Sequence, residues 1–400
     1  MFDLHTQNNQ APRIAVFGVG GCGCNSINQL SQSVLADNVQ LIAVNTDAQS
    51  LHVSQCSTRL QIGLEATKGL GAGARPQKGY DAAAESEAEL REYIELADII
   101  FITGGMGGGT GTGAIPFMAS VATELNKPLV AVVTTPFNFE GHQRGLMAKK
   151  GVDELMQHAN AVIVLPNDQL VKTLDKKVSL VNAFYESNRI LQDVLQGLTT
   201  TISQSGLINI DLNDFIAVVS HQGRAAMGVA RQMAGEDLQQ TINKALKNPL
   251  LEECDLSKAQ GAIVSVMATE NIELNQYNSI GETLQEQLDP AALVIIGLTI
   301  VPDLDCELEL MVIATGMQDE ADSLNAYVEQ ALVDQSLLNQ LLVEQQRPAG
   351  GKSHNHRFES SELLNLHDFL KEKSVREKSC DQFTTELEIP TYTRNQKRVY

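Results

Sequence analysis

GGMGGGTGTG, residues 104–113, decides the fold, because seven of its ten residues are glycine. It follows the apolar run DIIFIT (98–103) and precedes a helical pattern. Glycine costs roughly 0.5–1 kcal/mol of backbone entropy at each ordered position, so this concentration indicates positive-φ turns or backbone pressed against a ligand. Flexible glycine linkers seldom separate a buried strand from a helix. The stretch therefore predicts a phosphate cradle, to which Thr110 and Thr112 add hydroxyl groups.

A second glycine-rich turn, GVGGCGCNS (18–26), ends the first apolar run, RIAVFGV (13–19), and opens a helix. Its backbone N–H groups and the helix dipole favour a phosphate at this point. Alone, the turn is equally consistent with a dinucleotide-binding turn or with a merely tight turn.

Short apolar runs alternate with helical stretches around both turns, as in a parallel sheet covered by helices. Strands are expected at 13–19, 41–45, 98–103, 129–135 and 161–165, and helices near 22–34, 81–96, 112–125 and 142–158. Near-continuous apolar strands indicate burial on both faces. The fold class is thus α/β, with a doubly wound, mostly parallel nucleotide-binding sheet.

The second half of the chain has a different pattern. A long helix is expected at 179–203, and strands at 261–268, 293–301 and 307–316 predict a smaller α/β domain. The expected divisions are a flexible segment 1–12, a nucleotide-binding domain 13–178, the connecting helix 179–203, the smaller domain 204–317, a helical extension 318–345, a linker 346–386 and a terminal peptide 387–400.

Composition limits the partners. The formal net charge is −20, and the acidity belongs to residues 1–345, because 346–400 holds 10 basic and 8 acidic residues. An acidic surface repels nucleic acid and anionic lipid, so neither is expected to bind directly.

The first ten residues lack the pattern of a secretory signal, and no long apolar run exists, which predicts a cytoplasmic protein. The scattered cysteines are expected to be reduced thiols.

GGGTGTG (107–113) resembles the signature loop of the tubulin/FtsZ superfamily and differs from the GxxxxGK[ST] of P-loop enzymes. Six further blocks resemble this family in order: AVNTDAQ (43–49), TKGLGAGARP (67–76), PFNFEGHQR (136–144), PND (166–168), NAFYESN (182–188) and NIDLND (209–214). The resemblance covers roughly 13–317. It implies a tubulin/FtsZ-like fold, GTP/GDP binding, GTP hydrolysis with Mg²⁺, and head-to-tail self-assembly into the mid-cell ring of bacterial division.

The resemblance also implies roles for individual residues. The phosphate loops would be Gly21, Cys22, Gly23, Cys24 and Asn25, and Gly108, Gly109, Thr110 and Gly111. A switch loop near the terminal phosphate would be Gly71, Ala72 and Gly73. Ribose and phosphate contacts would come from Glu140 and Arg144, and base contacts from Phe184, Asn167 and Asn188. Without the resemblance, Glu140 and Arg144 would be an ordinary surface pair four residues apart, and Phe184 a core side chain.

NIDLND would supply the hydrolytic residues Asp211, Asp214 and Asn209 on the same resemblance. In that family the acidic loop of one subunit enters the nucleotide pocket of the next, so hydrolysis would require assembly. From spacing alone, Asp211 and Asp214 are more consistent with capping of a helix N-terminus.

Three residues depart from the family pattern. Cys22 and Cys24 interrupt the usual glycine run, and a thiol at a helix N-terminus can have a lowered pKa, so we hypothesise that oxidation or alkylation blocks the site. Two inert small residues are the alternative. Arg189 replaces a commonly acidic residue and cannot accept hydrogen bonds from guanine, so guanine selectivity would rest on Asn167 and Asn188 or be looser.

The tail stretch LEIPTYTR (387–394) resembles the short terminal peptide of the family, which docks on membrane-tethering adaptors. Membrane attachment is therefore expected only through such adaptors. Two other functions stay open: a family member that assembles but hydrolyses weakly, and a nicotinamide-dependent oxidoreductase that uses the 18–26 turn.

Overall fold

A computed structural model describes residues 11–33, 35–169, 179–203, 206–221, 224–247, 256–301 and 304–317. All of these residues belong to one compact unit of the chain. The predicted extension (318–345), linker (346–386) and terminal peptide (387–400) lie outside the described residues. Those three assignments stay predictions.

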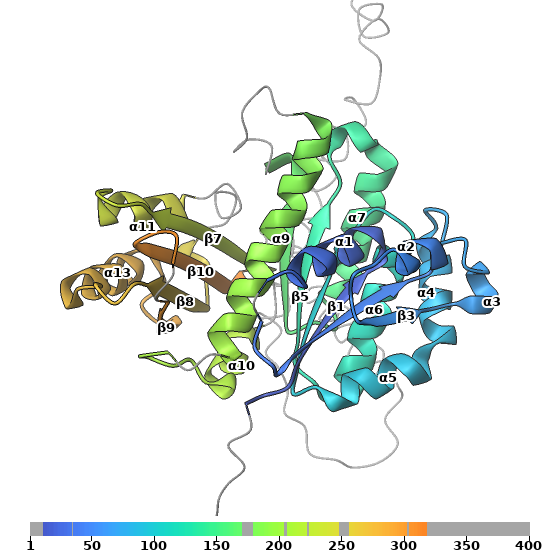
Figure 1. The fold of residues 1–400 in the computed structure, drawn as a ribbon, viewed down its shortest axis with the longest axis horizontal. Coiled ribbons are helices and arrows are strands. Elements are labelled where there is room, and N and C mark those ends of the chain that lie inside the picture. The colour runs from blue at the N-terminus through green and yellow to red at the C-terminus, as the bar shows by residue number, and fades with distance from the viewer. Residues whose placement is uncertain are drawn as a thin grey trace, which may run out of the picture. The chain divides into compact units, whose positions relative to one another are not determined.

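One ten-stranded sheet runs through the described residues in the order β3-β2-β1-β4-β5-β6-β7-β10-β8-β9 (Figure 1). The strands are β1 (Ile14–Val19), β2 (Val39–Asn45), β3 (Thr58–Gln61), β4 (Ile99–Gly105), β5 (Leu129–Thr135), β6 (Ala161–Pro166), β7 (Arg224–Gln232), β8 (Gly261–Ala268), β9 (Leu293–Ile300) and β10 (Leu308–Met317). Only β10 runs antiparallel to its two neighbours. The predicted mostly parallel α/β sheet is confirmed.

The two halves of the chain share this sheet, because β6 pairs with β7 in parallel through Val162 with Arg224 and Ile163 with Ala225. The helices are α1 (Gly20–Leu30), α2 (Ala48–His52), α3 (Leu64–Thr67), α4 (Pro76–Glu85), α5 (Glu87–Leu96), α6 (Thr110–Glu124), α7 (His142–Leu155), α9 (Leu180–Ser203), α10 (Leu212–Val219), α11 (Leu238–Leu246) and α13 (Leu274–Gln287), with short 3₁₀ turns at Asn138–Glu140 and Leu256–Lys258.

Strand β1 shows why the first half is layered. Its side chains alternate between two hydrophobic clusters, since Phe17 and Val19 pack with residues of α4 to α7, whereas Ile14 and Val16 pack with residues of α1 and α9. Helices therefore cover both faces, as the apolar strands predicted (Figure 1).

The structure differs from the prediction at three elements. The helix expected at 81–96 is two helices, broken at Ser86. Strands β3 and β7 were not predicted. TRLQ is short and mostly polar, and RAAMGVARQ is rich in alanine and contains a glycine, which disfavour strands.

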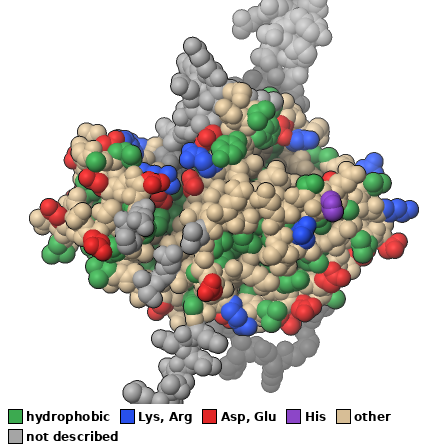
Figure 2. Space-filling view, in the orientation of Figure 1, with side chains coloured by type: hydrophobic (Ala, Val, Ile, Leu, Met, Phe, Trp, Pro, Cys, Tyr) green, Lys and Arg blue, Asp and Glu red, His purple; other side chains and the backbone are tan. Residues whose placement is uncertain are grey.

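Acidic and basic side chains are mixed over the face drawn in Figure 2. Among the helices that the structure describes, none combines the length and apolar character needed to cross a bilayer.

The long helix α9 is amphipathic, with buried Leu191, Val194, Leu195 and Leu198 turned toward the sheet. It connects the first half of the chain to α10 and the second half (Figure 1).

Candidate functional site

Two helix N-termini meet at the carboxyl ends of adjacent strands. Strand β1 leads directly into α1, and β4 leads through the glycine loop into α6. Because Val19 of β1 pairs with Gly104 of β4, the two loops lie side by side. The dipoles and free N–H groups of both helices favour an anion here. The two glycine turns therefore lie together as predicted, and their role as a phosphate cradle stays a prediction.

Glycine is required where the loops touch. A Cβ on Gly111 would lie 2.5 Å from the Gly105 carbonyl oxygen, and one on Gly23 would lie 2.5 Å from the Thr103 oxygen. Gly107 has a φ of +96°, which side chains disfavour. Its N–H donates to Thr112 Oγ1 at 2.9 Å, which fixes the loop.

A cavity of about 540 Å³ opens over both loops. The predicted site residues that line it are Gly21, Cys22, Asn25, Gly108, Gly109, Thr110, Gly111, Glu140, Arg144, Asn167, Phe184 and Asn188. Residues that the sequence analysis did not select also line it: Val19, Gly20, Gly105, Met106, Gly107, Thr134, Pro136 and Ser187. Ser187 lies nearly one helical turn after Phe184, and that spacing could have found it.

Five predicted residues do not line the cavity. Gly23 and Cys24 pack α1 on the sheet, and Cys24 is buried. The loop Gly71, Ala72 and Gly73 lies against the signature loop, because a Cβ on Gly109 would be 2.7 Å from Ala72 Cβ. Gly71 and Gly73 have φ values of +79° and +60°.

Glu140 and Arg144 form an ion pair of 2.6 Å at the wall of the cavity. Glu140 also accepts a hydrogen bond from the Phe137 N–H at 3.0 Å, so the carboxylate is held from two sides. The Arg144 side chain stays about half exposed. It can therefore place a cation beside a bound phosphate.

An aromatic cluster marks the other end of the cavity. Phe184 contacts Phe137 edge to face, with ring centroids 5.0 Å apart, and Phe139 stacks on Phe137 at 4.8 Å. Phe184 remains exposed on its cavity side and can pack on a planar base. Arg189 does not line the cavity, and its guanidinium pairs with Glu186 at 2.8 Å.

The pKa values of the two loop thiols contradict the expectation of reactive thiolates. Burial raises the pKa of Cys22, and it raises the pKa of Cys24 to about 12. For both thiols, desolvation by burial is the largest cause of the shift in pKa. Both residues are protonated thiols near neutral pH, so the predicted lowered pKa is wrong.

The acidic residues lie away from this cavity. Asp211 is the N-cap of α10, and its Oδ1 accepts the Asp214 N–H at 2.8 Å. Asn209 Oδ1 accepts the Gly206 N–H, and all three side chains are exposed. From Asn188 to the end of α9 at Ser203 the helix rises about 22 Å at 1.5 Å per residue. The acidic loop and the cavity are thus at opposite ends of α9 (Figure 1).

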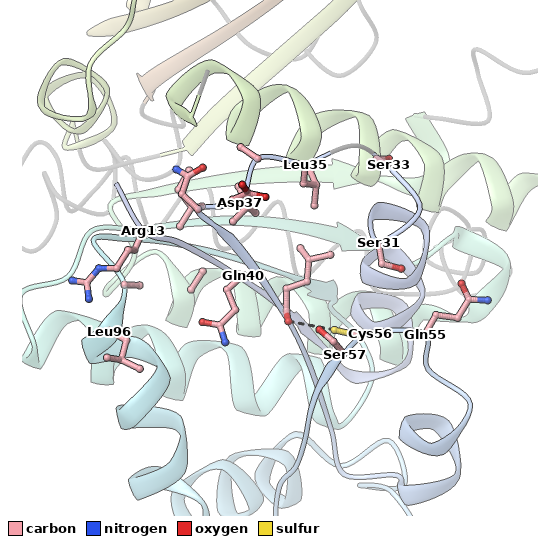
Figure 3. Close-up of a pocket in the computed structure, with 17 residues that line it drawn as sticks. Arg13, Ser31, Ser33, Leu35, Asp37, Gln40, Gln55, Cys56, Ser57 and Leu96 are labelled. Carbon is pink, nitrogen blue, oxygen red and sulfur yellow. Dashed lines mark hydrogen bonds between the residues drawn. The ribbon is translucent and has the colours of Figure 1, made fainter. Parts of the chain in front are cut away.

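A larger cavity of about 830 Å³ lies at the amino ends of β1 and β2 (Figure 3). Its lining includes Ser31 and Ser33, just after the carboxyl end of α1, where the dipole disfavours anions. Arg13 is paired with Asp98 at 2.9 Å. The phosphate-binding features therefore point to the smaller cavity.

Comparison with known proteins gives two family matches. Residues 13–175 match the Tubulin/FtsZ family GTPase domain, and residues 223–318 match the FtsZ family C-terminal domain. "Cell division protein FtsZ" of Wigglesworthia glossinidia brevipalpis is 37% identical over 383 residues, which cover 96% of each chain. Its counterpart in Coxiella burnetii is 39% identical over 321 residues, 80% of this chain and 83% of the relative.

Among solved structures, the chain is similar to an empty FtsZ dimer from M. jannaschii. The TM-score is 0.74 at 34% identity, covering 79% of this chain and 90% of that one. A CetZ2 protofilament from Haloferax volcanii has a TM-score of 0.66 at 19% identity, which speaks for the fold alone.

Proposed function

Because the chain belongs to the tubulin/FtsZ family and is a GTP-binding, polymerising GTPase of cell division, we propose that its hydrolysis is completed between subunits. GTP would occupy the 540 Å³ cavity of one subunit, and the acidic loop of the next subunit would supply Asp211 and Asp214. Family membership removes the nicotinamide-dependent oxidoreductase from consideration.

The observation that carries the proposal is the separation of cavity and acidic loop. A helix rise of about 22 Å lies between Asn188 and the end of α9, so Asp211 cannot reach its own cavity. A second copy joined head to tail would bring its exposed loop to that cavity. Such an interface does not close on itself, and it generates a filament.

In this arrangement each group has a separate task. The N–H groups of the α1 and α6 termini and Arg144 would bind the phosphates, while Phe184 would pack on the base. Asp211 and Asp214 would orient and polarise the attacking water. Mg²⁺, when bound with the nucleotide, would neutralise phosphate charge, held mainly by phosphate oxygens and water.

We further propose that the filaments form the mid-cell ring in the cytoplasm and attach to the membrane through adaptors that bind residues 387–400. Deletion of residues 385–400 should leave polymerisation intact and abolish recruitment to adaptor-bearing membranes. Unchanged recruitment would exclude this role for the tail.

Assembly-dependent hydrolysis is tested by phosphate release and light scattering with GTP and Mg²⁺ over a range of protein concentrations. The rate per subunit should be close to zero below a threshold concentration and rise together with the scattering above it. A rate per subunit that is independent of concentration would contradict hydrolysis at an interface.

A further inference from the structure

Thr110 shares a hydrogen bond with a residue that does not line the cavity. Its hydroxyl oxygen lies 2.6 Å from that of Thr46, which directly follows the carboxyl end of β2. Thr110 is the first residue of α6 and lines the 540 Å³ cavity, whereas Thr46 is completely buried. Among the residues that the structure describes, each of these two hydroxyl groups is the only hydrogen-bond partner of the other.

Burial decides which of the two hydroxyl groups donates. A hydroxyl group has one proton to donate and an oxygen that can accept, so the contact alone permits either direction. If Thr110 donated, the proton of Thr46 would be buried without an acceptor, a penalty of about 5- to 150-fold in the folding equilibrium. If Thr46 donates, the proton of the half-buried Thr110 is free to face the cavity. The buried Thr46 is therefore the donor.

The backbone of Thr46 is held in place by other contacts. Its carbonyl oxygen accepts hydrogen bonds from the Gly71 N–H at 3.2 Å and from the Thr67 hydroxyl group at 3.1 Å. Since the χ1 angle of threonine is restricted, the Thr46 hydroxyl group is presented to Thr110 from a fixed position. A donor that is oriented before the ligand arrives needs no reorganisation when the ligand binds.

The Thr110 hydroxyl group adds a donor to a part of the cavity where donors already gather. The free N–H groups of the first turn of α6 begin at this same residue. Phosphate oxygens accept hydrogen bonds, and a cluster of donors at a helix N-terminus matches them. The phosphates are therefore the part of a nucleotide that this hydroxyl group would meet.

We propose that Thr46 is a positioning residue of the nucleotide site: it donates its hydroxyl proton to Thr110, so that the Thr110 hydroxyl group donates to a bound phosphate. The proposal rests on the nucleotide site proposed above. Thr46 acts on the ligand through Thr110 and does not touch it. Thr46→Val removes the hydroxyl group at nearly constant shape, and Thr46→Ser keeps the hydroxyl group.

The test is equilibrium binding of a non-hydrolysable GTP analogue and of guanosine, each in competition with a fluorescent GDP analogue. Thr46→Val should weaken binding of the GTP analogue about fivefold, because the Thr110 hydroxyl group loses the bond that directs it. Guanosine carries no phosphate, so its affinity should change by less than about 1.5-fold. Thr46→Ser should bind both ligands as the unmodified protein does.

A double-mutant cycle shows whether Thr46 acts through Thr110. Thr110→Val should weaken binding of the GTP analogue about tenfold or more, and adding Thr46→Val should then have no further effect. Thermal unfolding without ligand gives a second cycle. Thr110→Val should lower the Tm, because it leaves the Thr46 hydroxyl group buried without a partner, and the double variant should recover most of this loss.

Three results would overturn the positioning role. They are an unchanged affinity for the GTP analogue in Thr46→Val, an equal loss of affinity for the analogue and for guanosine, and a further loss when Thr46→Val is added to Thr110→Val. The comparison of the double variant with Thr110→Val keeps the test available even where Thr46→Val alone does not fold. Failure of the unmodified protein to bind the fluorescent GDP analogue would instead overturn the nucleotide site, and with it the proposed function.

Discussion

Asp211 has two possible tasks, and substitutions can separate them. Its Oδ1 accepts the Asp214 N–H at 2.8 Å and caps α10, so loss of this bond should cost about 1 kcal/mol. In a protein of this size that corresponds to a fall in Tm of roughly 2 °C. Asn caps a helix as well as Asp, but it cannot act as a carboxylate. Asp211→Asn should therefore retain the Tm, and Asp211→Ala should lower it.

The phosphate-release rate should respond to the two substitutions differently from the Tm. If the carboxylate polarises the attacking water in a neighbouring subunit, both variants should lose about 100-fold or more of the phosphate-release rate. GDP affinity should be unchanged in both, because α9 separates the loop from its own cavity. Differential scanning fluorimetry, phosphate release and GDP titration measure the three quantities. Normal turnover in Asp211→Asn would show that Asp211 only caps the helix.

Three further predictions concern other parts of the molecule. Gly79→Ala should lower the free energy of unfolding by about 2–3 kcal/mol, because the new Cβ would lie 2.3 Å from the Gly109 carbonyl oxygen. At the exposed Gly145, where a Cβ meets no atom within 4 Å, substitution by Ala should instead raise the Tm. Burial raises the pKa of Asp193, so the ionisation of this carboxyl group opposes folding. Asp193→Asn should therefore raise the Tm at pH 7.5. The increase in Tm should be lost below about pH 4, where aspartate is protonated in the folded and the unfolded protein. Because burial raises the pKa of Cys22, its alkylation should be slow at pH 7, accelerate above about pH 9, and be blocked by GDP.

Controls and contrary outcomes for these predictions are direct. Equal Tm values for Gly79→Ala and Gly145→Ala would contradict the close approach of α4 to the signature loop. A stabilisation by Asp193→Asn that persists at pH 3 would show that the effect is not ionisation. Fast alkylation of Cys22 at pH 7, located by mass spectrometry, would show a thiolate where we expect a thiol.

The arrangement of the two glycine loops could be predicted from the sequence, because it depends on local backbone geometry. Gly107 adopts a positive φ, and Gly111 allows a close approach of the backbone. Both requirements arise where a strand ends and a helix begins. The mostly parallel sheet followed from apolar runs buried on both faces. Short or alanine-rich strands such as β3 and β7 carry too weak a pattern, and they form because neighbouring strands offer unpaired edges.

The base end and the thiols could not be predicted, because they depend on contacts between distant segments. Ser187 and Asn167 are 20 residues apart, and nothing local to either shows that they share a hydrogen bond. The position of Cys22 at a helix N-terminus suggested a lowered pKa, but packing between β5, α9 and α1 desolvates the thiol. The helix N-terminus alone suggested a lowered pKa for Cys22, whereas burial raises it.

Complementation between two inactive variants tests hydrolysis across the interface most directly. Asp211→Asn lacks the acid but retains the cavity. Gly108→Asp places a carboxylate where a Cβ meets no atom within 4 Å, so it should fold, repel phosphate and leave the acidic loop intact.

In an equal mixture, about one interface in four joins an intact cavity to an intact loop, because a head-to-tail contact takes one part from each subunit. Phosphate release should therefore recover to about a quarter of the rate of the unmodified protein. Gly108→Asn is the control for shape without charge. A mixture that stays as inactive as its separate components would contradict hydrolysis in trans.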